Sequence, residues 1–404
     1  MKSKIDALIE LEAKRQSEYV EIIASENFVS EAVLRANGSV LTNKYAEGYP
    51  SRRYYDGCEV IDEIETLAIE TAKKIFNAKF ANVQPHSGTQ ANMAVYMAFL
   101  KPGDKILGLS LTSGGHLTHG HFVSNTGKIF DSKHYTVDET TGILDYDAIL
   151  EVALKEKPKM IICGASAYSR KIDFSKFREI ADKVGALLLA DIAHISGLVV
   201  TGRHQNPLPY CDIVTTTTHK TLRGPRGGLI LTNNPEIAEK IDKSVFPGTQ
   251  GGPIVNIIAA KAVAFEEATT PEFKTYIDNV LSNMKAMENV FRENKIKMIT
   301  DGTDNHLILI DVKKSFNITG QRASSLLFLS HIIVNKNTIP FETLGPNITS
   351  GIRIGSPAMT TKGFTNVAFE KLTSIIIDVL KHNDEEYAKN QTPKILKLIK
   401  EYEH

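Results

Sequence analysis

The sequence predicts an α/β protein, with a large domain built on a mostly parallel sheet flanked by helices and a smaller α+β domain at the C-terminus. Between about residues 105 and 232, short apolar runs alternate with amphipathic segments, an order typical of a parallel sheet covered by helices. With 404 residues, 42% of them hydrophobic, the chain is long enough for more than one domain. We expect an N-terminal helix and arm over 1–45, the large domain over 46–279 and the small domain over 280–404.

Individual elements follow from hydrophobic period and from flanking turn residues. Apolar residues recur with a helical period from Val60 to Phe76, and Gly185 stands at the C-cap position of a helix expected over 174–184. Short apolar or β-branched runs predict strands. The expected helices are 5–21, 60–76, 93–100, 174–184 and a long span over 254–294, and the expected strands are 160–163, 186–190, 213–218, 228–232 and 307–310.

Composition excludes several classes of function. Lysine plus arginine and aspartate plus glutamate are both 47, so the formal charge is zero and nothing favours general binding to nucleic acid or to an anionic membrane. Cys58, Cys163 and Cys211 are scattered, which argues against a disulfide framework or a thiolate metal site. No apolar run reaches membrane-spanning length, and the first residues contain no signal-like apolar region. We expect a soluble cytoplasmic protein with a small-molecule substrate.

Lys220 is the first candidate for chemistry. It follows the polar end of a predicted strand and precedes the turn from Gly224 to Gly228. Nearby Arg223 and Arg226 favour a neutral, nucleophilic amine by like-charge repulsion, as a lysine that attacks a carbonyl requires. A solvated loop lysine is the alternative.

Two further motifs fit a phosphorylated cofactor with a ring nitrogen. Asp191 follows the apolar run 186–190, and the carboxyl ends of such strands bind ligands in open α/β sheets. A carboxylate there can pair with the protonated ring nitrogen of pyridoxal 5'-phosphate (PLP). The motif Gln84 to Asn92 opens a helix with hydroxyl residues and a glycine, which favours an anion site. Ordinary helix caps are the alternative for both motifs.

A run of histidines and an embedded arginine complete the set. His116, His119 and His121 lack a neighbouring carboxylate and the spacing of one helical face, so we expect no metal. His116 instead suits stacking on an aromatic cofactor ring. Arg353 lies in an apolar alternating stretch, where its planar fork matches a substrate carboxylate, with an internal salt bridge as the alternative.

Four segments together resemble serine hydroxymethyltransferase. They are Leu41-Thr-Asn-Lys-Tyr-Ala-Glu-Gly-Tyr-Pro50, Gly114-Gly-His-Leu-Thr-His-Gly120, Thr215-Thr-Thr-Thr-His-Lys220 with Gly224-Pro-Arg-Gly-Gly228, and Phe246-Pro-Gly-Thr-Gln-Gly-Gly-Pro253. The resemblance runs in order from about Glu21 to Pro357. It implies a fold-type I PLP-dependent transferase, active as a homodimer with shared active sites.

The resemblance also implies a reaction. Serine would transfer its side-chain one-carbon unit reversibly to tetrahydrofolate, giving glycine and methylene-tetrahydrofolate, through a PLP aldimine and a quinonoid carbanion. We keep a folate-independent aldolase acting on threonine-like amino acids as the alternative, and a regulator that has lost turnover as the non-enzymatic one.

The resemblance assigns a role to each matching residue. Lys220 would form the aldimine, Asp191 would pair with the ring nitrogen, His116 would stack on the ring and His194 would lie near the phenolic oxygen. The remaining cofactor residues would be Ser87, Gly88 and Thr89 at the phosphate, Ser166, and Tyr45 and Gly252 from the partner chain. Arg353 and Ser25 would hold the substrate carboxylate, and Tyr55 would line the site. Glu47 would move protons, and His219 and Thr217 would complete the catalytic set. The residues that would contact folate are Leu111, Leu117 and Asn337.

Overall fold

The computed structural model describes residues 3–402, which form two compact units. The large unit consists of Val29–Ser166 and Lys171–Ile277. The small unit consists of the described residues up to Phe28, the short segment Ala167–Arg170, and the chain from Asp278 onward. The division at residues 45 and 279 that we expect from the sequence stays a prediction.

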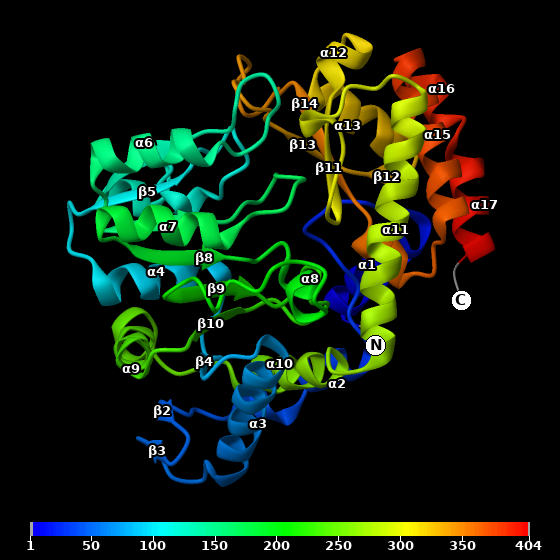
Figure 1. Ribbon diagram of the computed structural model, residues 1–404. Coiled ribbons are helices and arrows are strands. Elements are labelled where there is room, and N and C mark those ends of the chain that lie inside the picture. The colour runs from blue at the N-terminus through cyan, green and yellow to red at the C-terminus, as the bar shows by residue number, and fades with distance from the viewer. Residues whose placement is uncertain (1–2, 403–404) are drawn as a thin grey trace. The chain divides into compact units, whose positions relative to one another are not determined.

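A seven-stranded sheet forms the centre of the large unit (Figure 1). The strands from β9 to β6 pair in parallel, whereas β10 runs antiparallel to both β9 and β4. The prediction of a mostly parallel sheet is therefore confirmed. In spatial order the strands are β4 (Phe80–Asn82), β10 (Gly228–Thr232), β9 (Ile213–Thr217), β8 (Leu187–Asp191), β7 (Met160–Cys163), β5 (Lys105–Leu109) and β6 (Asp131–Tyr135).

Helices flank this sheet. Buried residues of α4 and α9 pack against strand residues such as Ile162 and Leu189, while α6 and α7 contact each other on the other side in Figure 1. Asp173 caps the start of α7, and Gly185 ends it in a left-handed conformation. The elements are α2 (Glu31–Asn37), α3 (Glu59–Phe76), α4 (Gly88–Phe99), α5 (Asn125–Ile129), α6 (Tyr146–Glu156), α7 (Phe174–Val184), α8 (Ser196–Val200), α9 (Pro235–Lys243) and α10 (Val255–Glu267), with the short elements η1 (Val40–Asn43), β2 (Gly48–Tyr49), β3 (Arg52–Arg53), η2 (Leu117–His119) and η3 (Ser244–Thr249).

The small unit combines an antiparallel sheet with helices. The sheet has the order β11-β14-β13, and Arg353 at the middle of β14 is opposite Leu309 on one side and Asn335 on the other. β1 pairs in parallel with β12. The elements are α1 (Lys4–Glu18), β1 (Val20–Glu21), η4 (Ile299–Asp301), β11 (Leu307–Asp311), α12 (Val312–Phe316), α13 (Gly320–Leu329), β12 (Ile332–Ile333), β13 (Asn335–Asn337), β14 (Gly351–Gly355), α14 (Pro357–Thr361), α15 (Asn366–His382), α16 (Glu385–Lys389) and α17 (Thr392–Tyr402), and α11 (Pro271–Glu293) runs from the large unit into the small one.

Three expected helices differ from the structure by more than one residue at an end. The first helix ends at Glu18, because Val20–Glu21 pair with β12 instead of continuing the helix. The span 254–294 is two helices, since α10 ends at Glu267 and Pro271, which is favourable at a first helical position, begins α11. The helix expected from Met93 begins at Gly88, because the Ser87 side chain caps it.

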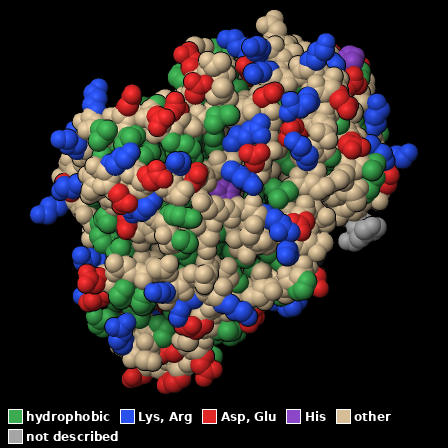
Figure 2. All heavy atoms as spheres, viewed as in Figure 1, with side chains coloured by type: hydrophobic (Ala, Val, Ile, Leu, Met, Phe, Trp, Pro, Cys, Tyr) green, Lys and Arg blue, Asp and Glu red, His purple; other side chains and the backbone are tan. Residues whose placement is uncertain are grey.

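The surface agrees with the balanced composition. Figure 2 shows lysine and arginine side chains interspersed with aspartate and glutamate over most of the face drawn. Among the helices of the described residues, we find none with the length and apolar character needed to span a bilayer.

Candidate active site

Asp191, the last residue of β8, lies at the centre of a hydrogen-bond network. Its Oδ2 accepts from Asn92 Nδ2 at 2.9 Å and from His119 Nε2 at 3.1 Å, and its Oδ1 accepts from the Ala193 amide at 3.1 Å. Burial acts to raise the pKa of the carboxyl, but the hydrogen bonds and the neighbouring histidines outweigh it and lower the pKa below its usual range. Asp191 is therefore a stable buried anion at neutral pH.

The two histidines beside Asp191 have defined hydrogen-bonding roles. The amide of His116 donates to Nδ1 of His119 at 3.2 Å, so the proton of His119 belongs on Nε2, which donates to Asp191. The amide of Thr118 donates to Nδ1 of His116 at 3.2 Å. Burial lowers the pKa of His116 to about 4, although Asp191 opposes the shift. His116 is thus a neutral ring held beside an anion.

Lys220 lies near the same histidine. It follows β9 by three residues, and its charge contributes to lowering the pKa of both His116 and His219. Asp191 has the opposite effect on His116, because its negative charge raises the pKa of that imidazole. That Lys220 and Asp191 serve one ring-shaped ligand stays a prediction.

His219 has a buried atom that suits a bound group. Burial lowers its pKa to about 3, with further contributions from Lys220, Arg226 and Lys261. Its Nδ1 is buried and has no hydrogen-bond partner among the described residues. A buried polar nitrogen without a partner costs free energy, which a ligand acceptor or donor at this position would recover.

The N-terminus of α4 packs directly against the strand that leads to Lys220. Ser87 caps the helix, its Oγ accepting from the Gln90 amide at 3.2 Å. A Cβ on Gly88 would lie 2.6 Å from Thr217 Cγ2, so only glycine fits this approach. Thr89 is exposed on the first turn. The first amides of a helix have no partner within the helix, so this turn, close to the end of β9, suits an anion.

Ser166 lies in a loop adjoining both Asp191 and the histidine segment. Its amide donates to the Gly114 carbonyl at 2.7 Å. Two residues earlier, Gly164 has a φ of +140° and approaches Asp191 so closely that a Cβ would lie 2.1 Å from the Asp191 carbonyl oxygen. The loop after β7 is therefore held against the end of β8.

Thr217 and His194 lie on the neighbouring segments. Thr217 Oγ1 donates to the Ala193 carbonyl at 3.4 Å, and the His194 carbonyl accepts from Thr221 Oγ1 at 2.9 Å. The chain before and after Lys220 is thus bound to the segment that follows Asp191.

A second cluster of predicted residues forms elsewhere in the large unit. Tyr55 Oη donates to Glu47 Oε2 at 3.4 Å, the rings of Tyr45 and Tyr55 meet edge to face with centroids 5.6 Å apart, and a Cβ on Gly252 would lie 3.2 Å from Tyr45 Cε1. Tyr45 is 59% exposed and Tyr55 is 47% exposed. The structure therefore brings these four residues together at a surface.

Arg353, Ser25 and Asn337 belong to the small unit. Arg353 is 8% exposed, and burial lowers its pKa to about 10, so it keeps its charge at neutral pH. Its Nη2 donates to Ser25 Oγ at 3.3 Å and its Nε to Asn335 Oδ1 at 3.1 Å. Asn337 lies on β13 and donates to the Thr338 carbonyl at 2.7 Å. Arg353 and Ser25 are thus a contacting pair.

The two predicted leucines flank the histidine segment of the large unit. Leu111 is partly buried in the loop after β5, and Leu117, the first residue of η2, is 43% exposed. Exposed apolar side chains beside His116 suit an apolar part of a ligand.

Sequence reasoning missed Asn92 and His119 as functional candidates, although both lie within motifs that it singled out. It also found no carboxylate for the histidines, whereas the ligand atoms of His116, His119 and Asp191 lie within 4.8 Å of one another. Both Nδ1 atoms of these histidines already accept backbone N–H groups, which favours a hydrogen-bond network as the use of this cluster.

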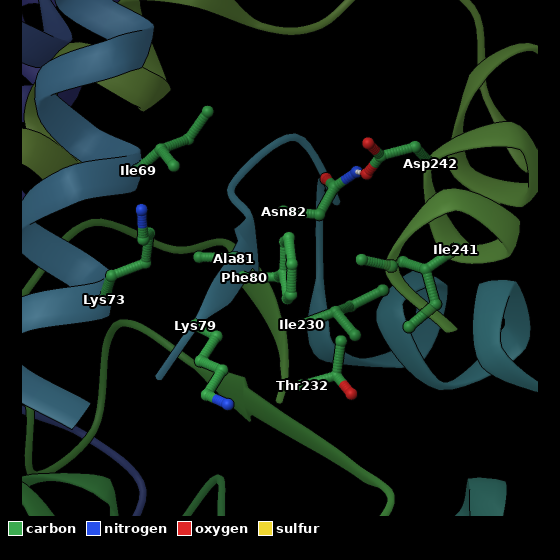
Figure 3. Close-up of a pocket in the computed structure, with 11 residues that line it drawn as sticks. Ile69, Lys73, Lys79, Phe80, Ala81, Asn82, Ile230, Thr232, Ile241 and Asp242 are labelled. Carbon is green, nitrogen blue, oxygen red and sulfur yellow. Dashed lines mark hydrogen bonds between the residues drawn. The ribbon is translucent and has the colours of Figure 1, made fainter. Parts of the chain in front are cut away.

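Figure 3 shows a separate pocket of the large unit, at the edge strand β4 and between α3 and α9. Asn82 Nδ2 donates to Asp242 Oδ1 at 2.8 Å at one side of it. Its lining residues include none of the predicted site residues. This hydrogen bond positions Asn82, whose Oδ1 in turn accepts from the amide of Gln84 at 3.0 Å.

Comparison with known proteins gives a consistent result. The family model described as serine hydroxymethyltransferase matches residues 1–376. Three similar proteins carry that name. The protein of Nostoc sp. is 60% identical over 94% of this chain and 89% of its own length, that of Malacoplasma penetrans is 59% identical over 91% and 90%, and that of Prochlorococcus marinus is 56% identical over 98% and 97%. With a family match over most of its length and relatives at this identity, the chain belongs to the serine hydroxymethyltransferase family.

Proposed function

We propose that the protein moves the side-chain one-carbon unit of serine reversibly to tetrahydrofolate, leaving glycine, with PLP held at Lys220 in a fold-type I architecture. Membership of the family supports the reaction. The observation that carries the assignment of residues is that hydrogen bonds from Thr217 and Thr221, on either side of Lys220, connect the chain to the segment that follows Asp191. A lysine amine and a ring-pairing carboxylate must be near neighbours to serve one cofactor.

The residues of the large unit fit PLP in charge and shape. Bound PLP would supply an aldehyde for amines and a protonated ring that accepts electrons from the bond that breaks. Asp191 would keep the ring nitrogen protonated, and neutral His116 would stack on the ring without adding a competing charge. Ser87, Gly88 and Thr89 would bind the phosphate at the N-terminus of α4.

Other residues of this unit would position the reacting groups. His194 would lie near the phenolic oxygen of the ring and Ser166 would contact the cofactor, because His194 follows β8 by three residues and the loop of Ser166 approaches Asp191 at Gly164. Thr217 lies three residues and His219 one residue before Lys220, and we assign them to orienting its amine.

Substrate binding would use a charged arginine. Arg353 and Ser25 would bind the serine carboxylate, since the guanidinium stays protonated and Ser25 already contacts it. Glu47 would move a proton at the serine hydroxyl, with Tyr55 as its hydrogen-bond partner. Leu111, Leu117 and Asn337 would contact the folate.

We also propose that the protein is a cytoplasmic homodimer with shared active sites. Tyr45, Tyr54 and Tyr55 are 59%, 74% and 47% exposed, and such a group of aromatic side chains at a surface favours burial against another chain. Tyr45 and Gly252 would then reach the phosphate held by the partner. The three cysteines are buried free thiols, which supports a reducing compartment.

Serine turnover measured with and without tetrahydrofolate tests the reaction. The proposal expects glycine formation from serine to depend strongly on tetrahydrofolate, whereas the alternative, a folate-independent aldolase acting on threonine-like substrates, expects equal rates. Equal rates contradict the transferase assignment.

A second test addresses the cofactor directly. The purified protein should show the visible absorbance of bound PLP, and Lys220→Ala should lose it. Persistence of the same spectrum in Lys220→Ala contradicts the role of Lys220.

A further inference from the structure

Lys261 is a fully buried lysine that none of the proposed catalytic steps uses. It lies on α10 and is 1% exposed. Its Nζ donates to three backbone carbonyls, those of Val83 at 2.6 Å, Pro85 at 3.0 Å and Gly228 at 2.8 Å. An ammonium has three N–H donors, whereas a neutral amine has two and would turn its lone pair toward the third carbonyl. This geometry therefore selects the charged form, even though burial lowers the pKa of the amine to about 7.

The three carbonyls belong to the two segments that surround the N-terminus of α4. Val83 and Pro85 lie just before Ser87, and Gly228 opens β10 at the end of the turn that follows Lys220. The Gly228 amide donates back to the Pro85 carbonyl at 3.0 Å, and a Cβ on Gly228 would lie 2.4 Å from the Ser87 carbonyl oxygen. One ammonium thus fixes the backbone on which the proposed phosphate-binding turn rests.

The ionisable groups near Lys261 do not neutralise its positive charge, so this charge can act on a bound anion. Glu65 is the carboxylate whose charge acts on Lys261, but it is bound by Arg53 at 2.6 Å and by Gln84 at 2.7 Å. Burial, together with the charge of Lys261, lowers the pKa of His86 and of His219, so both are neutral. A buried cation close to an anion site attracts a dianion more strongly than an exposed lysine would, because little water screens it.

We propose that Lys261 is a positioning residue for the phosphate group of PLP. It sets the amides at the N-terminus of α4 against the Lys220 turn and adds positive potential behind them. This inference rests on the proposed binding of PLP at Lys220. A purely structural role predicts instead that loss of Lys261 weakens every ligand of this unit equally.

The test compares PLP with pyridoxal, which has the same ring and aldehyde but no phosphate. Dissociation constants for both are measured on the apoprotein by visible absorbance. Lys261→Met, similar in size but uncharged, should weaken PLP binding by about tenfold or more, the scale of a lost charged interaction, and pyridoxal binding by less than about twofold. Equal weakening of both ligands, or no change in either, overturns the proposal.

Gly227→Ala provides a second variant that keeps the lysine. A Cβ at Gly227 would lie 2.3 Å from Lys261 Cε and 2.9 Å from Nζ, so the side chain must move from its carbonyls. Gly227→Ala should therefore weaken the binding of PLP but not that of pyridoxal. If Lys261→Met does not fold, the two dissociation constants are compared in Gly227→Ala instead. Phe265→Leu, another buried position of α10, is the matched control and should lower stability without changing the ratio of PLP to pyridoxal affinity.

Inorganic phosphate separates this inference from the proposed function. The wild-type apoprotein should bind phosphate, measured by calorimetry, and Lys261→Met should bind it at least about tenfold more weakly. A wild-type protein that binds PLP, combined with unchanged phosphate and PLP affinities in Lys261→Met, refutes the role of Lys261 alone. A wild-type protein that takes up neither PLP nor phosphate refutes both proposals.

Discussion

Arg53 offers the sharpest test of how the Glu47 segment is held. Its side chain is 4% exposed, and it pairs with Asp62 at 2.8 Å and with Glu65 at 2.6 Å. Its Nη1 donates to the carbonyls of Ala46 and Gly48, both at 3.0 Å. These two carbonyls stand on either side of Glu47, so one guanidinium connects a candidate catalytic residue to α3.

The magnitude follows from what Arg53→Met leaves behind. Glu65 is 1% exposed, and breaking a buried ion pair by removing one partner costs about 3–5 kcal/mol. Burial already raises the pKa of Glu65, and Arg53 opposes that shift, so the variant raises the pKa further. When the pKa of a carboxyl is higher in the folded protein than in the unfolded chain, its contribution to stability is fully present below the pKa of the unfolded chain. That contribution is lost as the pH rises through the pKa of the folded protein. The variant should therefore be least stable on the alkaline side.

Urea unfolding of the apoprotein measures the effect. Arg52→Met is the matched control, because Arg52 is exposed and its loss should change the free energy of unfolding by less than about 0.5 kcal/mol. Adding Glu65→Gln to Arg53→Met should restore part of the stability, since the unpaired charge is gone. Equal stability of the Arg52 and Arg53 variants, or strict additivity in the double variant, refutes the reasoning.

Three further predictions concern the site and the core. The pKa of His116 is lowered from its usual 6.5 to about 4, so between these pH values the unfolded chain binds more protons than the folded protein. The free energy of unfolding should therefore fall as the pH drops from 6.5 to about 4, and it should fall less in His116→Leu. Urea unfolding at about pH 7.5 and about pH 5 measures the difference. Gly164→Ala should weaken PLP binding by about tenfold or more in a spectroscopic titration, because its Cβ would meet the Asp191 carbonyl at 2.1 Å, while Gly345→Ala, in open space, should not. Phe369→Ala should cost about 3–5 kcal/mol in urea, since the ring is fully buried in the small unit, against less than about 1 kcal/mol for Phe328→Ala, which is 51% exposed.

The parts of the fold that the sequence predicts are those set by local interactions. The helix α7 and the strands β7 and β10 have the expected bounds, because their hydrophobic period and flanking caps lie within the segments themselves. Gly185 ends α7 in the left-handed conformation that its position indicates. The order βαβ also predicts the parallel sheet, since connections of this length return the chain to the same edge.

The parts that it does not predict depend on which distant segments become neighbours. His119 and Asp191 are 72 residues apart, and Lys261 and Val83 are 178 apart. Such contacts depend on the strand order that places β8 beside β9 and on the packing of α10, neither of which a local pattern determines. The motif containing His116 indicates a functional segment, but the role of His119 becomes visible only when Asp191 is beside it.

The pKa values around Asp191 explain why this network suits a pyridinium ring better than an internal salt bridge. A protonated imidazole beside Asp191 would neutralise the carboxylate and compete with any bound ring. Burial instead lowers the pKa of His116 to about 4, while His119 donates to Asp191 through its Nε2–H. His116 therefore adds no positive charge that would cancel the charge of Asp191 at neutral pH. A protonated ring nitrogen is the cation that would complete the pair, and this requires that His116 remain neutral when the ligand binds.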